Sequence, residues 1–131
     1  MAFAAATKVP IDKTRLEIER TMTRYGATHF ATFNEPERAM IAFRIKERNI
    51  RFTLALPAKM SDQVRRSRWR ALLLVIKAKL ESVDSAIETL EEAFLPHIVM
   101  PSGQTVYEEI KSPIALGYEN NSNVPLLPAP R

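Results

Sequence analysis

The sequence has 131 residues, 46% hydrophobic and 26% charged, which is typical of one globular domain. It has no cysteine and no apolar run of the roughly 18 residues that would span a bilayer, which excludes disulfide bonds, thiol chemistry and a membrane helix, and we expect a cytoplasmic protein. The net charge of +4 is unevenly divided: residues 1–80 hold 17 Lys/Arg against 7 Asp/Glu, whereas residues 81–131 hold 2 against 8.

The first predicted element is a helix that starts near residue 11 and ends at Gly26. Asp12 or Thr14 could cap its start, and Arg20 and Arg24 are expected elsewhere on its surface. Its apolar residues recur at helical spacing, at Ile11, Ile18, Met22 and Tyr25. This stripe predicts that the helix packs against another layer.

That layer is predicted to be a sheet of three short strands, over residues 28–33, 38–45 and 49–56. The last two strands alternate clearly between apolar and polar residues, which is typical of a hairpin with one buried face. A two-residue loop at Glu47 and Arg48 would pair Ile45 with Ile50, so that inward residues face one another. A four-residue loop over 46–49 is equally compatible with the sequence.

The other face of this hairpin is predicted to be basic. The same register sets Arg44 opposite Arg51, near Lys46 and Arg48. Like charges directly opposed on a sheet are unfavourable unless an anion or a carboxylate relieves them. The pattern therefore indicates an anion partner, unless the two arginines simply splay into solvent.

A long helix is predicted from Ser61 or Asp62, as caps, to at least Glu81. Its middle is apolar almost all round, so we expect it to be buried, with Trp69 as a core or rim anchor. A helical projection separates its basic residues into two groups, which are Arg66, Arg70 and Lys77 on one side and Arg65, Arg68 and Lys79 on another. We therefore expect the middle of this helix to belong to the core and its basic residues to form an exposed surface.

The remaining chain is acidic and helical. Residues 62–95 could form one helix or two, and a possible capping box of Ser85 with Glu88 favours a break near Asp84. Thr105 with Glu108 offers another capping box, before a helix to about residue 111. A last short helix is expected to start at residues 112–113, a serine followed by proline.

Motifs for catalysis and cofactor binding are not found in the sequence. Its three glycines are far apart, which excludes a glycine-rich phosphate loop. His29 and His97 have no partner at helical spacing, so a metal site is not expected. Adjacent acidic residues on a helix diverge by about 100° and cannot share a proton. We therefore expect no enzyme activity, no cofactor and no metal.

Together the elements predict one α+β domain over residues 1–131, with extended tails at 1–9 and 120–131. A helix lies on a three-stranded antiparallel sheet (α-β-β-β-α), and additional C-terminal helices pack on the same core. Double-stranded RNA-binding domains share this order of elements, and in them the start of the last helix meets phosphates. The shared order is an analogy of fold and does not establish function.

The sequence as a whole also resembles a family of small, uncharacterised accessory proteins of tailed phages and prophages. The resemblance rests on the segments VPIDKTRLEIE, RWRALLLVIKAKLESV and FLPHIVMPSGQTV and on the closing LLP, so it covers most of the chain. It implies an accessory protein in the cytoplasm of a bacterial host. The connection PAKMSDQV is longer in similar proteins, which places any function of that loop in doubt here.

We predict a non-catalytic protein that binds nucleic acid, DNA or RNA, through the basic hairpin and the start of the long helix. The residues expected to contact phosphates are Arg44, Lys46, Arg48, Arg51, Arg65, Arg66, Arg68 and Arg70. The alternative is a protein-binding inhibitor or adaptor that docks on a host or phage protein with an acidic surface, or that forms a homo-oligomer. Neither alternative involves a membrane.

Overall fold

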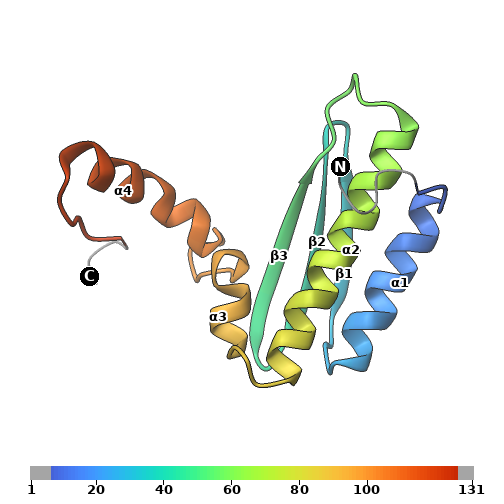
Figure 1. Ribbon diagram of the computed structural model, residues 1–131, viewed down its shortest axis with the longest axis horizontal. Helices are drawn as coiled ribbons and strands as arrows, with labels where there is room; N and C mark the ends of the chain where they lie inside the picture. The colour runs from blue at the N-terminus through green and yellow to red at the C-terminus, as the bar shows by residue number, and fades with distance from the viewer. Residues whose placement is uncertain (1–6, 127–131) are drawn as a thin grey trace.

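The computed structural model describes residues 7–126, so the outer parts of both predicted tails lie outside the described residues. Its elements, shown in Figure 1, are α1 (Ile11–Arg24), β1 (Phe30–Glu35), β2 (Arg38–Ile45), β3 (Arg48–Ala55), α2 (Asp62–Asp84), α3 (Leu90–Phe94), the 3-10 helix η1 (Leu95–His97) and α4 (Val106–Asn120). This order confirms the predicted α+β class, with a helix, an antiparallel three-stranded sheet and further helices.

Helices α1 and α2 lie side by side and cover one face of the sheet (Figure 1). The strands are hydrogen-bonded in the order β1-β2-β3, so β1 and β3 are the edges. Burial alternates along β2, where Ala39, Ile41, Phe43 and Ile45 are buried and their neighbours are more exposed. The opposite face, which we call the outer face, carries exposed side chains such as Phe33.

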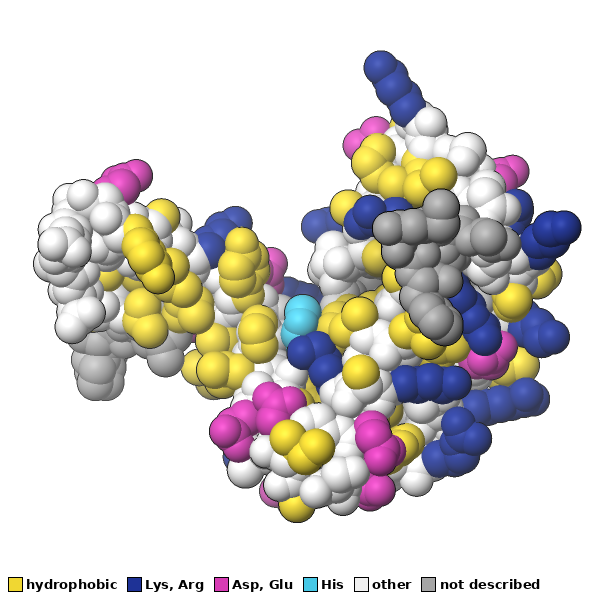
Figure 2. Space-filling view, in the orientation of Figure 1, with side chains coloured by type: hydrophobic (Ala, Val, Ile, Leu, Met, Phe, Trp, Pro, Cys, Tyr) yellow, Lys and Arg dark blue, Asp and Glu magenta, His cyan; other side chains and the backbone are white. Residues whose placement is uncertain are grey.

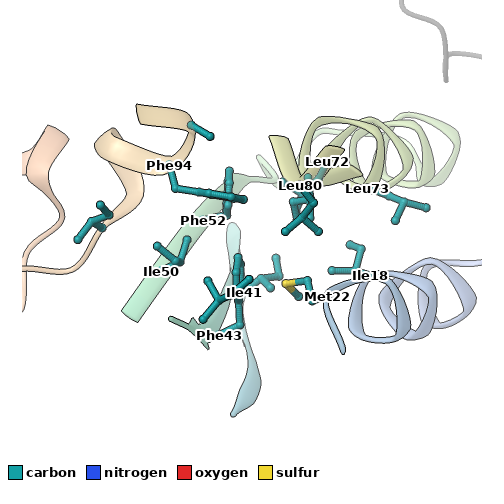
Figure 3. Close-up of a cluster of buried hydrophobic side chains, with 14 of the residues drawn as sticks. Ile18, Met22, Ile41, Phe43, Ile50, Phe52, Leu72, Leu73, Leu80 and Phe94 are labelled. Atoms are coloured by element: carbon teal, nitrogen blue, oxygen red, sulfur yellow. The ribbon is translucent and has the colours of Figure 1, made fainter. Parts of the chain in front are cut away.

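The core lies between the sheet and the helices. Figure 3 shows side chains from α1, α2, β2 and β3 pointing toward one another, with Phe94 of α3 closing one side next to Phe52. Trp69 is 1% exposed, which confirms it as a core anchor. Burial of these aromatic and aliphatic side chains supplies the main stabilisation of the fold.

The predicted register of the hairpin is wrong by two residues. Phe43 pairs with Ile50, and Ile45 pairs with Arg48 instead of Ile50. The two turn residues are therefore Lys46 and Glu47, both with positive φ (46° and 64°). A slip of two residues leaves every side chain on its own face, so the apolar alternation fits both registers equally well.

The same shift removes the predicted opposition of Arg44 and Arg51. Arg44 pairs across the strands with Asn49, whose side-chain oxygen accepts a hydrogen bond from it at 3.2 Å. Arg51 faces Ala42 and forms an ion pair with Glu108 at 2.6 Å. The repulsion that indicated an anion partner is therefore absent from this pair.

The helix ends agree with the sequence at some positions only. Ser61 caps α2 by accepting a hydrogen bond from the backbone N–H of Val64, as expected. α1 starts after Pro10 without a side-chain cap, so the predicted capping by Asp12 or Thr14 is wrong. α2 ends at Asp84, close to the predicted break.

The predicted capping box at the start of α3 lies four residues too early. Ser85 is the C-cap of α2, and the box is formed by Thr89 with Glu92. Ala86 then takes a left-handed conformation, with φ of 59°, in a Schellman motif in which its N–H donates to the carbonyl of Val83. Residues 62–95 therefore contain two separate helices.

The C-terminal part leaves the core after a short contact. Buried side chains of α3 complete the core beside β3, and Ile98 forms a bridge with Ile50. The predicted capping box of Thr105 and Glu108 is confirmed at the start of α4. The expected new helix at Ser112 is wrong, because α4 continues through Pro113 and extends away from the sheet (Figure 1).

Candidate nucleic-acid interface

The structure distributes the eight predicted basic residues over three places. Arg44 and Arg51 lie on the outer face of the sheet, and Lys46 and Arg48 lie at the hairpin turn. The four arginines between residues 65 and 70 lie in the first turns of α2. The prediction treated these groups as one surface, so their separation decides whether they can act together.

The hairpin turn and the start of α2 lie at opposite ends of the sheet (Figure 1). Lys46 lines a shallow hollow with Val83, in the last turn of α2, and Ala86, just after that helix ends. α2 has 23 residues, and at about 1.5 Å per residue it is about 34 Å long. The two groups are therefore not brought together into one compact patch.

Three of the predicted residues are engaged in contacts that hold the chain together. Arg48 forms an ion pair with Glu91 of α3 at 3.4 Å. Arg51 donates to the carbonyl of Gly103 in addition to its ion pair with Glu108. Arg65 donates to backbone carbonyls of the loop between β3 and α2, at Leu56, Pro57 and Met60. These cations have partners within the fold.

The two predicted sides of α2 are confirmed by its neighbours. Arg70 faces α1, where it forms an ion pair with Glu17 at 2.8 Å. Lys79 faces the other way and donates to the carbonyl of Ala93 in α3. Arg66 and Lys77 share the side of Arg70, since they are spaced from it by one and two helical turns. A row of three cations thus borders α1.

Helix α1 contributes a second row of cations beside the first. Lys13, Arg20 and Arg24 are exposed and spaced by seven and four residues, so they share one side of the helix. Figure 2 shows Lys and Arg side chains gathered over the part of the molecule formed by α1 and α2. We call this surface the basic seam, defined by Lys13, Arg20, Arg24, Arg66, Arg70 and Lys77.

One carboxylate lies inside the basic seam. The pKa of Glu17 is below its usual value, chiefly because Arg70 donates a hydrogen bond to it, with further attraction from Lys77 and Lys13. Glu17 is therefore ionised at neutral pH and neutralises one of the six cations. The seam keeps a net charge of about +5, counted as six cations and one carboxylate.

The three cations of α1 were missed by the sequence analysis. Arg20 and Arg24 were expected elsewhere on the surface, and Lys13 was not considered. The available signal was the spacing of Lys13, Arg20 and Arg24, together with the apolar stripe that must pack beside α2. The spacing alone does not predict on which side of α1 the helix α2 packs.

Within residues 7–126, no group of three or more His, Asp or Glu side chains is placed to hold a metal ion. No helix in this part of the chain is long and apolar enough to cross a membrane. Comparison of the chain with protein-family models, with curated proteins and with solved structures found no match.

Proposed function

We propose that this protein is non-catalytic and binds nucleic acid through the basic seam of α1 and α2. The observation that carries the proposal is the pair of cation rows on two neighbouring helices, with a single carboxylate between them. Its resemblance to phage accessory proteins supports a role in the cytoplasm of a bacterial host. Arg66 and Arg70 are the residues that this surface shares with the site predicted from sequence.

The dimensions of the two rows suit a phosphate backbone. Each row covers eleven residue steps, from Lys13 to Arg24 and from Arg66 to Lys77, which is about 16 Å of helix axis. One strand of a duplex carries a phosphate about every 3.4 Å along its axis, so a row of this length is opposite roughly five phosphates. Three cations can therefore each reach a different phosphate.

The chemistry of the seam favours binding without sequence preference. Its charged ends are lysine and arginine side chains on helix exteriors, which contact phosphates readily and carry no sequence information in doing so. Such binding is driven by release of counterions and weakens steeply with salt. With six phosphate contacts, log Kd should change with log salt with a slope of about 5 for a duplex and about 4 for a single strand.

The test measures fluorescence anisotropy of labelled duplex DNA, duplex RNA and single strands between 50 mM and 500 mM salt. Lys77→Gln should weaken binding and lower the salt slope by about one, because one phosphate contact is lost. Lys46→Gln is the matched control, since Lys46 is also an exposed lysine without an ion pair in the described chain but lies at the hairpin turn. It should leave affinity and slope unchanged.

Glu17 provides a test of opposite sign. Glu17→Gln removes the carboxylate that neutralises part of the seam, so nucleic-acid affinity should rise and not fall. A loss from Lys46→Gln with no loss from Lys77→Gln would locate the contact at the hairpin end instead. Absence of binding at 50 mM salt, or binding that is undiminished at 500 mM, would contradict the proposal.

A further inference from the structure

Beyond Ile110, which packs against the core, the apolar side of α4 is largely exposed within residues 7–126. Tyr107, Ile110, Ile114 and Tyr118 are spaced by three or four residues and form one stripe. The side chains of Ile114 and Tyr118 are 39% and 87% exposed. Within the described part of the chain, the returning segment with Val124 and Leu126 borders the last turns. A helix stripe of this kind usually packs against a partner surface.

The first turn of α4 is fixed beside the sheet, where Tyr107 lines a hollow with Arg38 and Arg51. The N–H of Val106 donates to the carbonyl of Ile98 at 2.9 Å, and Glu108 pairs with Arg51. η1 is the main packing partner of α4 within the described residues. Figure 1 shows α4 leading away from the sheet beyond this first turn, so the later residues of the stripe lie away from the sheet.

The outer face of the sheet is the matching uncovered surface. A shallow hollow on this face is bordered by Phe33 and Arg44, and Ala31 and Ala42 form its floor. Phe33 is 53% exposed, although it lies in a strand. The small alanine side chains leave room for an inserted aromatic or aliphatic side chain.

The two surfaces also carry opposite charge. The outer face has Arg38, Arg44 and Arg51 against Glu35, a balance of 3 − 1 = +2. Helix α4 has Glu108, Glu109 and Glu119 against Lys111, a balance of 1 − 3 = −2.

Arg51 and Glu108 pair with each other within one chain. Four of the other charges form no ion pair within residues 7–126, namely Arg44, Glu109, Lys111 and Glu119. An acidic, apolar helix matches this face, whereas a phosphate backbone would leave the apolar hollow unfilled.

We infer that α4 of one copy packs on the outer face of a second copy, with the same contact made in return. Its apolar stripe would fill the hollow beside Phe33, and Glu119 would approach Arg44. A two-fold arrangement makes each contact twice, which doubles the buried area that a helix of 15 residues can provide. The basic seam lies on the opposite side of the sheet and stays accessible in this dimer.

Sedimentation velocity of the full, nuclease-treated chain tests this inference, and we expect a concentration-dependent dimer. Ile114→Asp on α4 and Phe33→Glu on the outer face should each raise the dimer dissociation constant by about tenfold or more. Ile87→Asp is the control, since Ile87 is 77% exposed but lies between α2 and α3. Unchanged urea midpoints, followed by Trp69 fluorescence, show that the variants fold.

Charge reversal tests the proposed pairing. Arg44→Glu and Glu119→Arg should each weaken the dimer, and the double variant should recover most of the loss. A chain that remains monomeric at all concentrations would overturn the inference, as would a Phe33→Glu variant that dimerises like the unmodified protein. Because no nucleic acid is present, such a failure leaves the proposal for the basic seam unaffected.

Discussion

Helices α2 and α4 are both amphipathic, but their apolar sides have different surroundings. In α2 the residues Trp69, Leu73, Ile76 and Leu80 are each at most 1% exposed, packed among the sheet, α1 and α3. In α4 only Val106 is buried and Ile110 is partly buried against the core, whereas Ile114 and Tyr118 are exposed. Both patterns have helical spacing, so the difference arises from the position of each helix in the chain.

This difference teaches what an apolar stripe can and cannot predict. The stripe of α2 follows directly on the hairpin that it covers, so a short connection returns it onto the sheet. By the time α4 begins, α1, α2 and α3 already cover the inner face. Its stripe has no remaining inner surface to cover. Amphipathicity thus identifies the face that avoids water, and not the partner that covers it.

The largest expected effect is a loss of stability when a stripe residue of α2, but not of α4, is shortened to alanine. Leu73→Ala should lower the free energy of unfolding by about 3–5 kcal/mol, since a fully buried side chain is replaced by a cavity. The matched change Ile114→Ala should cost at most about 0.5 kcal/mol in the monomer, because its site is exposed. Urea unfolding at low protein concentration, followed by Trp69 fluorescence, measures both. Equal losses would show that α4 belongs to the core.

The fold class could be predicted from the sequence because local patterns determined it. Alternation located the three strands to within two residues at each end, and the stripe of α1 with the apolar middle of α2 predicted one buried layer. The hairpin register could not be predicted, since Lys46 and Glu47 lack the glycine or asparagine that usually marks such a turn. A register shifted by two residues keeps each side chain on the same face of the sheet, so the apolar alternation does not exclude it.

The candidate site was harder to predict than the fold. The sequence identified Arg66 and Arg70, but it joined them to hairpin residues that lie at the far end of α2. Strand order and helix direction decide which segments become neighbours, and charge counts along the chain contain neither. The partner of Arg51 is likewise distant in the sequence, a glutamate of α4, whereas Arg65 donates to carbonyl groups of the loop that precedes its own helix.

A smaller effect concerns the end of α2, where the chain turns toward α3. Ala86→Gly should stabilise the protein by about 0.5–1 kcal/mol, because alanine with φ of 59° is strained and glycine is not. The same exchange at Ala78, an exposed position inside α2, should destabilise it by about 1 kcal/mol. Thermal unfolding of the two variants compares them. A loss at both positions would contradict the left-handed conformation of Ala86.

The ion pair that holds the first turn of α4 allows a test whose expected effect on the free energy of unfolding is of comparable or smaller size. Arg51→Thr removes the ion pair with Glu108 and the hydrogen bond to Gly103, and should cost about 0.2–1 kcal/mol because the pair is partly exposed. Amide hydrogen exchange should accelerate in the first turn of α4. Arg15→Thr, which breaks a pair with Asp12 within α1, should leave that turn unchanged. The register predicted from sequence, with Arg51 facing Arg44, would instead leave the stability unchanged or raise it by a few tenths of a kcal/mol.

The smallest effect is a pH dependence at His97, between the buried α3 and the exposed α4. Burial is the main cause that lowers the pKa of His97 below 6.5, and Lys79 adds repulsion. The ring stacks on Phe52, with 4.0 Å between the ring centroids. The unfolded chain therefore binds a proton more readily than the folded chain. The stabilisation is complete above about pH 6.5 and is lost as the pH falls through the folded value.

Urea unfolding at pH 7.5, 6.5 and 5.5 measures this dependence. The unmodified protein should lose stability on acidification, and His97→Gln should lose less over the same range, since glutamine does not titrate. Proton NMR of the His97 ring provides a direct measure, because its midpoint should lie below that of a free histidine. A His97 midpoint at or above 6.5 would mean that η1 opens to solvent, and the boundary between buried and exposed chain would then begin before α4.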